Sequence, residues 1–399
     1  MSEKKSVFDR NPILTLIIFF IFISFLLDIS FTYIYKIYNS HKSQAQQIVS
    51  NEIRIKHPVY HHTFKANSNA NLEHSLLKRR WNEKTNSLGF KDNKIREIAL
   101  DSDKERVIFI GDSITEGIGY TFDETFVGII AKQLNKQGIE VLNASRVSYS
   151  PIIYWRKIKY LIEDVGLKFD EVIVLIDLSD VQDEAEVYKL DINQNVIDRE
   201  KSKAYLQARA LVINGDDSLP FASNLLIKNF LVKVRYLISE NTTLVYFMAN
   251  KIYDYTFDET TRVPYLYLNP DYTRFSWPFY QKAYDEYAEE GIKNSINYMN
   301  LLSELLKQND IKLTVGVYPL PNNIWFDNIE SKHVKIWKDW TQKENINFYN
   351  LFPELVDQNR SIKEKKSLID RFYIKYDMHF NKDGHKLFAS DFLDFYNNK

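Results

Sequence analysis

Short runs of β-branched and other apolar residues alternate with stretches of helical spacing from about residue 106 to the end of the chain. The apolar runs predict strands at 106–110, 140–143, 171–177, 312–318 and 347–350. Apolar residues recur with helical spacing at 126–137, 154–163, 284–309, 334–344 and 381–397. Nearly continuous apolar strands separated by helices are typical of a parallel sheet covered on both faces. The pattern therefore predicts an α/β fold with a site beyond the carboxyl ends of the strands.

The interval between the third and fourth predicted strands is much longer than one crossover helix requires. We interpret residues of about 183–280 as an inserted lid subdomain. The segment is rich in aromatic side chains, and aromatic faces above a cleft can bind sugar rings. These residues are Tyr246, Phe247, Tyr253, Tyr255, Tyr265, Tyr267, Tyr272, Phe275, Trp277, Phe279 and Tyr280. A small subdomain core is the alternative use of the same residues.

The N-terminal part of the chain contains an apolar run at 13–35 that is interrupted by Asp28. Spanning a bilayer takes about 20 apolar residues, so the run predicts a transmembrane anchor. Because a charge at mid-membrane costs about 3 kcal/mol, we expect Asp28 near one interface. Lys4, Lys5 and Arg10 precede the run and predict a cytoplasmic N-terminus by the positive-inside rule. No small-residue cleavage site follows, which favours an uncleaved anchor over a signal peptide, with a buried core helix as the alternative.

These observations divide the chain into four parts. Residues 1–12 form a cytoplasmic tail, 13–35 the anchor, 36–85 a polar stalk, and 86–399 the α/β domain with its insertion. The arrangement predicts a protein of the inner (cytoplasmic) membrane with a single pass. Everything after residue 40 is then expected to face the periplasm or the cell exterior.

Composition and charge exclude several classes of protein. The net charge is −1, and Lys is interleaved with Asp and Glu, which argues against a nucleic-acid partner. The absence of cysteine excludes disulfides, thiolate metal sites and a cysteine nucleophile. The sequence contains neither G-x-x-x-x-G-K-[ST] nor G-x-G-x-x-G, so it shows no phosphate-binding loop and no cofactor is expected.

The motif GDSITEG at 111–117 directly follows the first predicted strand. A serine that follows a strand, stands near glycines and opens a helix is held in a tight turn with its hydroxyl exposed. Backbone N–H groups at the start of such a helix supply a positive potential where an oxyanion would form. The motif differs from the G-x-S-x-G elbow of α/β-hydrolases because Thr115 stands at the position of the second glycine. Ser113 is therefore a candidate nucleophile.

From residue 86 to the C-terminus, the insertion excepted, the chain resembles the SGNH (GDSL-type) hydrolase superfamily. GDSITEG corresponds to the first of four family blocks, and NSLGF at 86–90 is similar to the N-x-x-G-F/Y lead-in of many membrane-tethered members. The resemblance implies a flavodoxin-like three-layer α/β/α fold and an enzyme that cleaves or transfers esters. It also implies that Ser113 is the nucleophile and that its own N–H contributes to the oxyanion hole.

The second and third family blocks supply the other donors of the oxyanion hole. In NASRVS at 143–148, Ser148 stands where the family has a glycine that donates its backbone N–H. In DLSD at 177–180, Ser179 stands where the family has an asparagine that donates its amide. The resemblance makes both serines candidate donors, and the alternative for Ser179 is a cap of the following turn. Asp112, Arg146 and Asp180 flank these positions and are candidate substrate contacts.

The last block is DMHFNKDGH at 377–385. Family members usually show D-x-x-H, and the D-x-H of this chain is similar to that of the related alginate-acetylation enzymes. The resemblance implies that His379 is the general base and that Asp377 holds its tautomer, as in a serine triad. Asn381 is expected to cap the final helix. His385, in the first turns of that helix, is the alternative base.

The remaining histidines lie outside any motif, and we expect them at a solvated surface: His41, His57, His61, His62, His74 and His333. Asp377, His379 and Asp180 are the candidates for a metal site. The chain has no H-E-x-x-H motif and no dense carboxylate array, so no metal is expected.

Together these features predict serine-dependent ester hydrolysis or O-acyl (acetyl) transfer on a cell-envelope polysaccharide or glycan, through an acyl-Ser113 intermediate. The expected partners are an acylated glycan or acyl donor, the membrane through the N-terminal helix, and a membrane-bound acyltransferase of the kind that accompanies tethered family members. The altered second and third blocks leave an alternative, an SGNH domain that binds glycan without turning it over. An envelope scaffold unrelated to catalysis is a third interpretation.

Overall fold

The computed structural model describes residues 11–74, 79–200, 242, 245, 272–375 and 377–398. The chain divides into two compact units. One comprises Met1–Gln47 and Asn214–Arg262, and the other comprises Ile48–Ile213 and Val263–Lys399. Most of the predicted cytoplasmic tail and most of the predicted lid lie outside the described residues.

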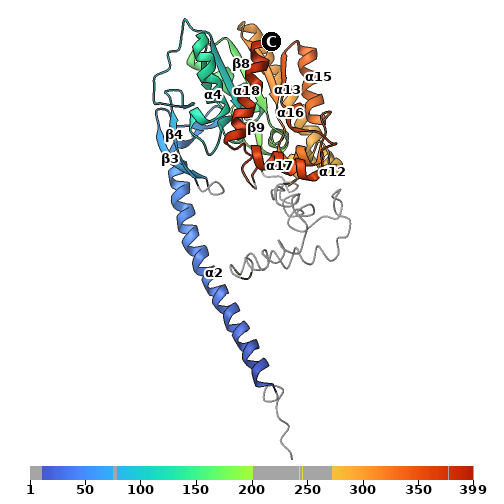
Figure 1. Ribbon diagram of the computed structural model, residues 1–399. Helices are drawn as coiled ribbons and strands as arrows, with labels where there is room; N and C mark the ends of the chain where they lie inside the picture. Colours follow the sequence, from blue (N-terminus) through green and yellow to red (C-terminus); the bar gives the residue numbers. More distant parts are fainter. Residues whose placement is uncertain are drawn as a thin grey trace, which may run out of the picture. The chain divides into compact units, whose positions relative to one another are not determined.

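Five parallel strands form the centre of the second unit (Figure 1). In spatial order they are β12 (Asn347–Asn350), β11 (Lys312–Val317), β8 (Glu171–Ile176), β6 (Arg106–Gly111) and β7 (Glu140–Asn143). Each coincides with a strand predicted from the sequence. Counted from β7, the order is that of a flavodoxin-like sheet, in which the direction of chain progress reverses between β6 and β8. Ligands of such sheets bind beyond the carboxyl ends of the strands at this switch point.

Buried strands and paired helices build the layers of the predicted α/β fold. Every residue of β6 and β8 is buried, as expected for strands covered on both faces. Helix α4 (Phe126–Leu134) packs against α18 (Lys382–Asn398), and α5 (Pro151–Tyr160) packs against α13 (Glu289–Gln308). Helix α15 (Lys332–Glu344) packs against β11 and β12.

Shorter elements connect this framework. All but one have six residues or fewer, too short for a helical or strand pattern to stand out in the sequence, and the exception, a helix of 11 residues at 362–372, was not predicted. The shorter elements are α3 (Ser113–Glu116), α6 (Asp180–Gln182), β9 (Tyr188–Leu190), β10 (Val196–Asp198), α11 (Tyr272–Ser276), α12 (Gln281–Ala283), α14 (Pro321–Phe326), α16 (Phe352–Leu355) and α17 (Ile362–Phe372). Several of them carry the residues of the candidate site.

The prediction of a stalk at 36–85 is wrong for residues 54–85. β1 (Arg54–His57) and β2 (His61–Phe64) form a hairpin, while β3 (Asn69–His74), β4 (Arg79–Thr85) and β5 (Lys91–Asp92) extend the main sheet beyond β7. The sequence pattern did not predict these strands because they lack continuous apolar runs. Along β4, buried residues alternate with partly exposed ones, so only one face of the strand is buried. Phe64, Leu72 and Trp81 of these strands form a small buried core with Ile53, the residue before β1.

Helix α2 (Pro12–Ile53) contains the predicted anchor. Its part Pro12–Ile34 has 23 residues and a mean hydropathy of 2.6, so it is long and apolar enough to cross a membrane. A signal sequence near the N-terminus would meet the same criteria. Asp28 is 2% exposed, and its Oδ2 accepts a hydrogen bond from the Val245 N–H at 2.9 Å within the same unit. A backbone N–H of the inserted segment therefore donates to the carboxylate that interrupts the apolar run.

Those parts of the predicted insertion that the structure describes in the second unit are packed rather than open. β9 and β10 pair as a hairpin. Trp277 is completely buried, and its Nε1–H donates to the Leu178 carbonyl at 3.0 Å, in the turn after β8. Phe275 and Tyr280 are buried as well, so these three aromatic side chains are part of a buried core. The aromatic residues at 246–267 lie outside the described residues.

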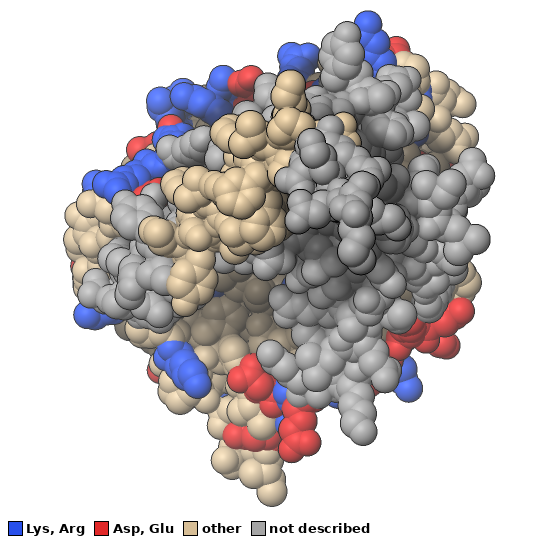
Figure 2. All heavy atoms as spheres, turned by 90° about the horizontal axis from the view of Figure 1, so that it is seen from below, with Lys and Arg blue, Asp and Glu red and all other residues tan. Residues whose placement is uncertain are grey.

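The described surface carries both signs of charge. On the face shown in Figure 2, Lys and Arg side chains lie beside Asp and Glu side chains around the rim. This distribution agrees with the interleaved charges of the sequence and its net charge of −1.

Candidate active site

Ser113 is the first residue of the one-turn helix α3, directly after the tight turn that follows β6. The Asp112 Oδ1 accepts a hydrogen bond from the Ile114 N–H at 2.9 Å and so caps the helix. Gly111 permits the close approach of Thr115, whose side chain would collide with any Cβ at position 111. The residues around the serine therefore fix the turn that presents its hydroxyl.

His379 lies in the loop between α17 and α18. An antiparallel bridge between Tyr373 and Phe380 closes this loop. Within it, the Ile374 N–H donates to the His379 carbonyl at 2.8 Å, and the Asp377 N–H donates to the Ile374 carbonyl at 2.9 Å. These backbone bonds hold the D-x-H segment in one conformation.

Asn381 caps α18, as predicted. Its Oδ1 accepts hydrogen bonds from the N–H groups of Asp383 at 2.9 Å and Gly384 at 3.1 Å. Its Nδ2 donates to the carbonyls of Arg371 at 2.9 Å and Tyr373 at 3.0 Å. Asn381 thereby joins the end of α17 to the start of α18 and anchors both ends of the loop that carries the candidate base.

The structure brings Ser113, His379 and Asp377 together. The His379 Nε2 lies 2.9 Å from the Ser113 Oγ, and the His379 Nδ1 lies 2.8 Å from the Asp377 Oδ1. Ser113 is 7% exposed, and the side chains of His379 and Asp377 are 16% and 13% exposed. Such distances allow a serine hydroxyl to donate to a histidine that a carboxylate orients. The candidate nucleophile, the candidate base and the carboxylate that would orient it thus meet beyond the carboxyl end of β6.

Negative charges around His379 favour its protonated form. Burial lowers the pKa of the imidazole, but the hydrogen bond with Asp377 and the charges of Asp377, Asp112 and Asp177 outweigh burial and raise the pKa of His379 above its usual value. A raised pKa makes the imidazole a stronger acceptor for the serine proton and stabilises the imidazolium that forms.

Ser148 follows β7 and adopts a backbone conformation that favours glycine. Its φ is +58°, in the left-handed region that residues with a Cβ rarely occupy. The Tyr188 hydroxyl donates to the Ser148 carbonyl at 2.8 Å and helps to hold this conformation. Ser148, which is expected at a glycine position, therefore adopts a backbone conformation typical of glycine.

Ser179 follows β8 and does not use its side chain as a cap. Its N–H donates to the Asp177 Oδ1 at 2.7 Å, and its carbonyl accepts from the N–H groups of Gln182 and Asp183, both at 3.1 Å. The hydroxyl makes no capping hydrogen bond to α6. The capping alternative therefore lacks its contact, and Ser179 remains a candidate oxyanion donor.

The three candidate substrate contacts are buried and bonded to the protein. Asp112, Arg146 and Asp180 are 5%, 2% and 0% exposed. Arg146 forms an ion pair with Glu116. The Asp180 Oδ2 accepts hydrogen bonds from the Tyr154 hydroxyl at 2.8 Å and the Asp177 N–H at 3.2 Å. The geometry therefore favours supporting roles over direct binding of a substrate.

Glu116 organises the second block, although its role was not predicted. Its buried carboxylate pairs with Arg146, accepts a hydrogen bond from the Val147 N–H at 2.7 Å, and lies 3.9 Å from an Arg54 nitrogen. Burial opposes its charge, but the facing guanidinium groups of Arg146 and Arg54 hold the pKa of Glu116 below its usual range. Glu116 thus joins the nucleophile turn to the loop of Ser148. An acid three residues after the serine, with an arginine in the next block, was the available sequence signal.

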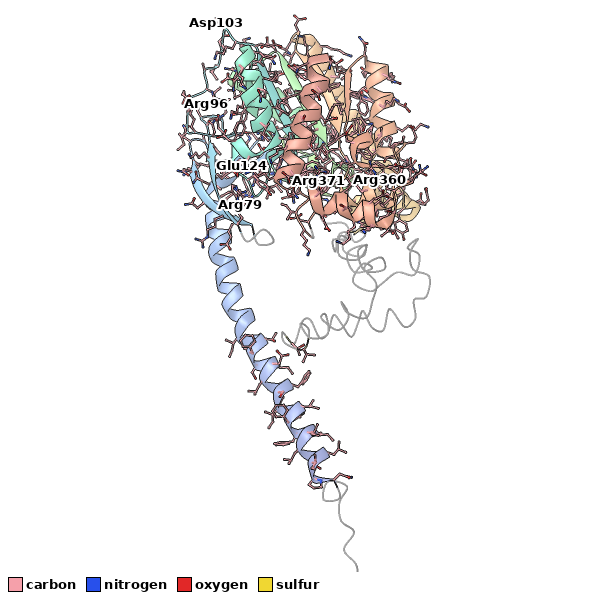
Figure 3. The ribbon with its side chains drawn as sticks, viewed as in Figure 1. Arg79, Arg96, Asp103, Glu124, Arg360 and Arg371 are labelled. Atoms are coloured by element: carbon pink, nitrogen blue, oxygen red, sulfur yellow. The ribbon has the colours of Figure 1, made fainter. Side chains whose placement is uncertain are left out.

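The N-terminal strands support the loop that follows the nucleophile. The buried Lys91 Nζ, directly after the NSLGF lead-in, donates to the carbonyls of Gly117 at 3.0 Å and Tyr120 at 2.8 Å. Arg79 of β4 pairs with Glu124 at 2.6 Å further along the same loop (Figure 3). Strands β4 and β5, on either side of the lead-in motif, therefore stabilise the loop that follows Ser113.

His385, the alternative base, binds a backbone N–H instead of the Ser113 hydroxyl. Its Nδ1 accepts a hydrogen bond from the Phe126 N–H at 3.2 Å, at the start of α4. Burial, with the nearby charges of Lys91 and His379, lowers the pKa of His385 to about 3. The structure therefore favours His379 as the base and gives His385 a packing role.

The surface prediction is wrong for His333. It is completely buried, and its Nε2 lies 3.3 Å from the Ile176 carbonyl at the end of β8. His57, His61 and His62 are half-buried, whereas the side chains of His41 and His74 lie outside the described set. Among the described residues, no group of three or more His, Asp or Glu is arranged to hold a metal ion.

No family model and no curated protein matches the sequence. Similar solved structures include a GDSL-like lipase from Bacteroides thetaiotaomicron, 12% identical, with a TM-score of 0.36 over 76% of this chain and 93% of that chain. An acetylxylan esterase from Geobacillus stearothermophilus is 12% identical, with a TM-score of 0.36 over 74% and 96% of the two chains. An esterase from Pseudoalteromonas sp. is 9% identical, with a TM-score of 0.33 over 74% and 98%. TM-scores this low carry no argument, so function must be inferred from the residues of this chain.

Proposed function

We propose that the chain is a membrane-anchored serine esterase or O-acyltransferase of the SGNH type, with Ser113 as nucleophile, His379 as base and Asp377 as the group that orients the base. The observation that carries the proposal is the continuous hydrogen-bonded chain from the Ser113 Oγ through His379 to Asp377, at 2.9 Å and 2.8 Å. Its place at the switch point of a flavodoxin-like sheet supports the same conclusion.

In this mechanism the Ser113 Oγ attacks the carbonyl carbon of an ester while the His379 Nε2 accepts the hydroxyl proton. The oxyanion would be bound by the N–H groups of Ser113 and Ser148 and by the Ser179 hydroxyl. The bond to the leaving oxygen breaks as His379 returns the proton to it, which leaves an acyl-Ser113. A second hydroxyl, from water or a sugar, then loses its proton to His379 and attacks the acyl carbon. The bond from that carbon to the Ser113 Oγ breaks, and His379 returns the proton to the Oγ, so both residues regain their first states.

The proposed substrate is an O-acylated, and above all O-acetylated, polysaccharide or glycan of the cell envelope. Two features support it. The apolar helix Pro12–Ile34 suits an anchor in the inner membrane, and the lysines and arginine before it favour a periplasmic or extracellular site. The D-x-H block is similar to that of alginate-acetylation enzymes, and a membrane-bound acyltransferase would supply the acyl donor. A reporter fused after residue 45 tests this topology, because activity only in the cytoplasm would contradict it.

Labelling by a fluorophosphonate tests the enzyme proposal, since only an activated serine reacts with the probe. The full chain in detergent should be labelled, and Ser113→Ala should not be. Absence of labelling in the folded full chain would refute the enzyme proposal and favour a glycan-binding module. With an aryl acetate as donor, acetylation of an added oligosaccharide then separates the transferase from the esterase.

Ser179→Ala is expected to lower kcat about 10- to 1,000-fold with little change in melting temperature. The reason is that the hydroxyl makes no capping hydrogen bond, so its removal costs an oxyanion donor but no cap. Turnover and melting temperature should be measured on the same sample.

The matched control is Ser331→Ala, because the Ser331 Oγ accepts a hydrogen bond from the His333 N–H and caps α15. This control should have a lower melting temperature than the wild type and an unchanged turnover per folded molecule. If Ser179→Ala behaves in the same way as the control, Ser179 does not belong to the oxyanion hole.

A further inference from the structure

The Ser113 Oγ lies between two groups that can accept its hydrogen. On one side is the His379 Nε2 at 2.9 Å, and on the other is the Asp112 Oδ2 at 3.2 Å. A serine hydroxyl has one hydrogen and cannot donate to both. When Asp112 is ionised, it competes with the base for the proton that the base must remove. When Asp112 is protonated, its own O–H can donate to the Ser113 Oγ and the competition disappears.

The contacts of Asp112 leave one of its oxygens free to carry a proton. The Oδ1 accepts the Ile114 N–H at 2.9 Å and lies 3.1 Å from the Tyr318 hydroxyl. The same hydroxyl lies 3.2 Å from the Asp177 Oδ2, so one hydrogen is shared between two carboxyl groups. The Oδ2 faces the Ser113 Oγ. If the Asp112 Oδ2 carries a proton, it can donate to the Ser113 Oγ, while the Oδ1 still accepts from the Ile114 N–H and the Tyr318 hydroxyl.

Building on the proposed function, we propose that Asp112 is a fourth catalytic residue that acts as a neutral carboxylic acid. Its Oδ2–H donates to the Ser113 Oγ, so the serine hydrogen points to the His379 Nε2, and the His379 Nδ1–H points to Asp377. The hydrogen bonds then run in one direction from Asp112 to Asp377. During attack the serine proton moves to His379, and the Asp112 proton stays on its own oxygen. Asp112 is therefore neither consumed nor regenerated in the cycle.

The surroundings of Asp112 favour its neutral form. Burial and the negative charge of Asp177 raise the pKa of Asp112 to about 7, against the opposing effects of the Ile114 N–H, the charge of His379 and the Tyr318 hydrogen bond. Asp180 is a further buried carboxyl group beside Asp177, and its pKa is also raised, by burial and by the charges of Asp177 and Asp112. The titratable groups that interact with Asp112 are Asp177, Asp180, His379, Tyr154 and Tyr318.

This arrangement determines the pH dependence of acylation. The active form requires a neutral His379 and a neutral Asp112. The rate rises with pH as His379 loses its proton, and it falls again as Asp112 loses its proton. The charge of each group shifts the pKa of the other. Neither limb of the rate profile can therefore be assigned to His379 or Asp112 alone.

The test is the rate of fluorophosphonate labelling of the full chain between about pH 5 and pH 10. The wild-type rate at about pH 9 should be at least about tenfold below its maximum. In Asp112→Asn, an amide N–H faces the Ser113 Oγ at every pH, so the alkaline limb should disappear and the rate at about pH 9 should stay within about twofold of the maximum of that variant. The acid limb should move to lower pH, because a negative charge beside His379 is gone.

Tyr318→Phe is the second variant, and it preserves the shape of a completely buried side chain. Its lost hydrogen bond should raise the pKa of Asp112 and move the alkaline limb to higher pH. A wild-type rate that stays level up to about pH 10, or an alkaline limb that Asp112→Asn retains, would overturn the proposal. So would an Asp112→Asn chain that melts as the wild type does but is not labelled at any pH. An unlabelled wild type is a different result, because it refutes the serine mechanism itself.

Discussion

Ester hydrolysis is expected to fall by about four orders of magnitude or more when Ser113 is replaced by alanine, and by a similar factor in His379→Ala. The physical reason is that the two side chains act as one unit. Without the Oγ no acyl intermediate forms, and without the imidazole 2.9 Å away the hydroxyl loses the base that removes its proton. Asp377→Asn should leave a measurable trace, because it disturbs the tautomer and orientation of His379 but leaves both reacting groups in place. The measurement is kcat/KM for a short-chain aryl ester.

His385→Asn is the matched control for the base. The asparagine keeps an acceptor for the Phe126 N–H, which the His385 Nδ1 now binds at 3.2 Å. Turnover per folded molecule should remain close to that of the wild type. If this variant is inactive while His379→Ala retains activity, the base has been assigned to the wrong histidine.

Glu116→Ala is expected to lower the free energy of unfolding by about 3–5 kcal/mol, a large part of the stability of an ordinary domain. Removing the carboxylate leaves the buried Arg146 guanidinium without its ion pair and the Val147 N–H without its acceptor. Arg146 is 2% exposed and cannot reach water in exchange. Chemical denaturation of the full chain in detergent measures the loss. Activity should fall as well, because the loop of Ser148 loses its tie to the nucleophile turn.

Two variants calibrate this prediction. Glu344→Ala removes an ion pair with Lys307 at 3.0 Å, whose lysine side chain is 57% exposed, and it should cost about 1 kcal/mol or less. Glu116→Gln keeps an acceptor for the Val147 N–H and should be less destabilising than Glu116→Ala. Equal stability of Glu116→Ala and Glu344→Ala would show that Glu116 does not hold the second block.

The sequence predicted the five central strands because parallel strands buried on both faces appear as continuous apolar runs. The strands at 69–74 and 79–85 were missed because even the buried face of β4 carries Glu83 and Thr85, so that Leu72 and Trp81 stood alone among polar neighbours. A pattern of this kind is difficult to distinguish from a polar linker until the pairing partner is known.

The candidate triad residues were accessible to sequence reasoning because each lies in a short motif, one directly after a strand and the other directly before the final helix. The supporting residues were not, because their partners are distant in the chain. Tyr318 meets Asp112 across 206 positions, and Arg146 meets Glu116 across 30. For the same reason Arg146 and Asp180 were interpreted as substrate contacts, although buried partners already bind them.

The conformation of Ser148 shows what a substituted motif can preserve. From the sequence, the loss of the family's glycine left the geometry of the oxyanion hole open. The left-handed φ of +58° shows that the backbone has kept the glycine conformation despite the added Cβ. Only coordinates could reveal this, because a serine carries no preference for that region.

The most direct test of the central claim is to find the acyl group on the enzyme. The full chain is mixed with an aryl acetate, quenched in acid within one turnover, digested and analysed by mass spectrometry. The serine mechanism predicts one acetyl group on Ser113 in the wild-type chain and none on the corresponding peptide of Ser113→Ala. An enzyme that hydrolyses the ester without ever carrying the acetyl group, or that carries it on another residue, would contradict the mechanism.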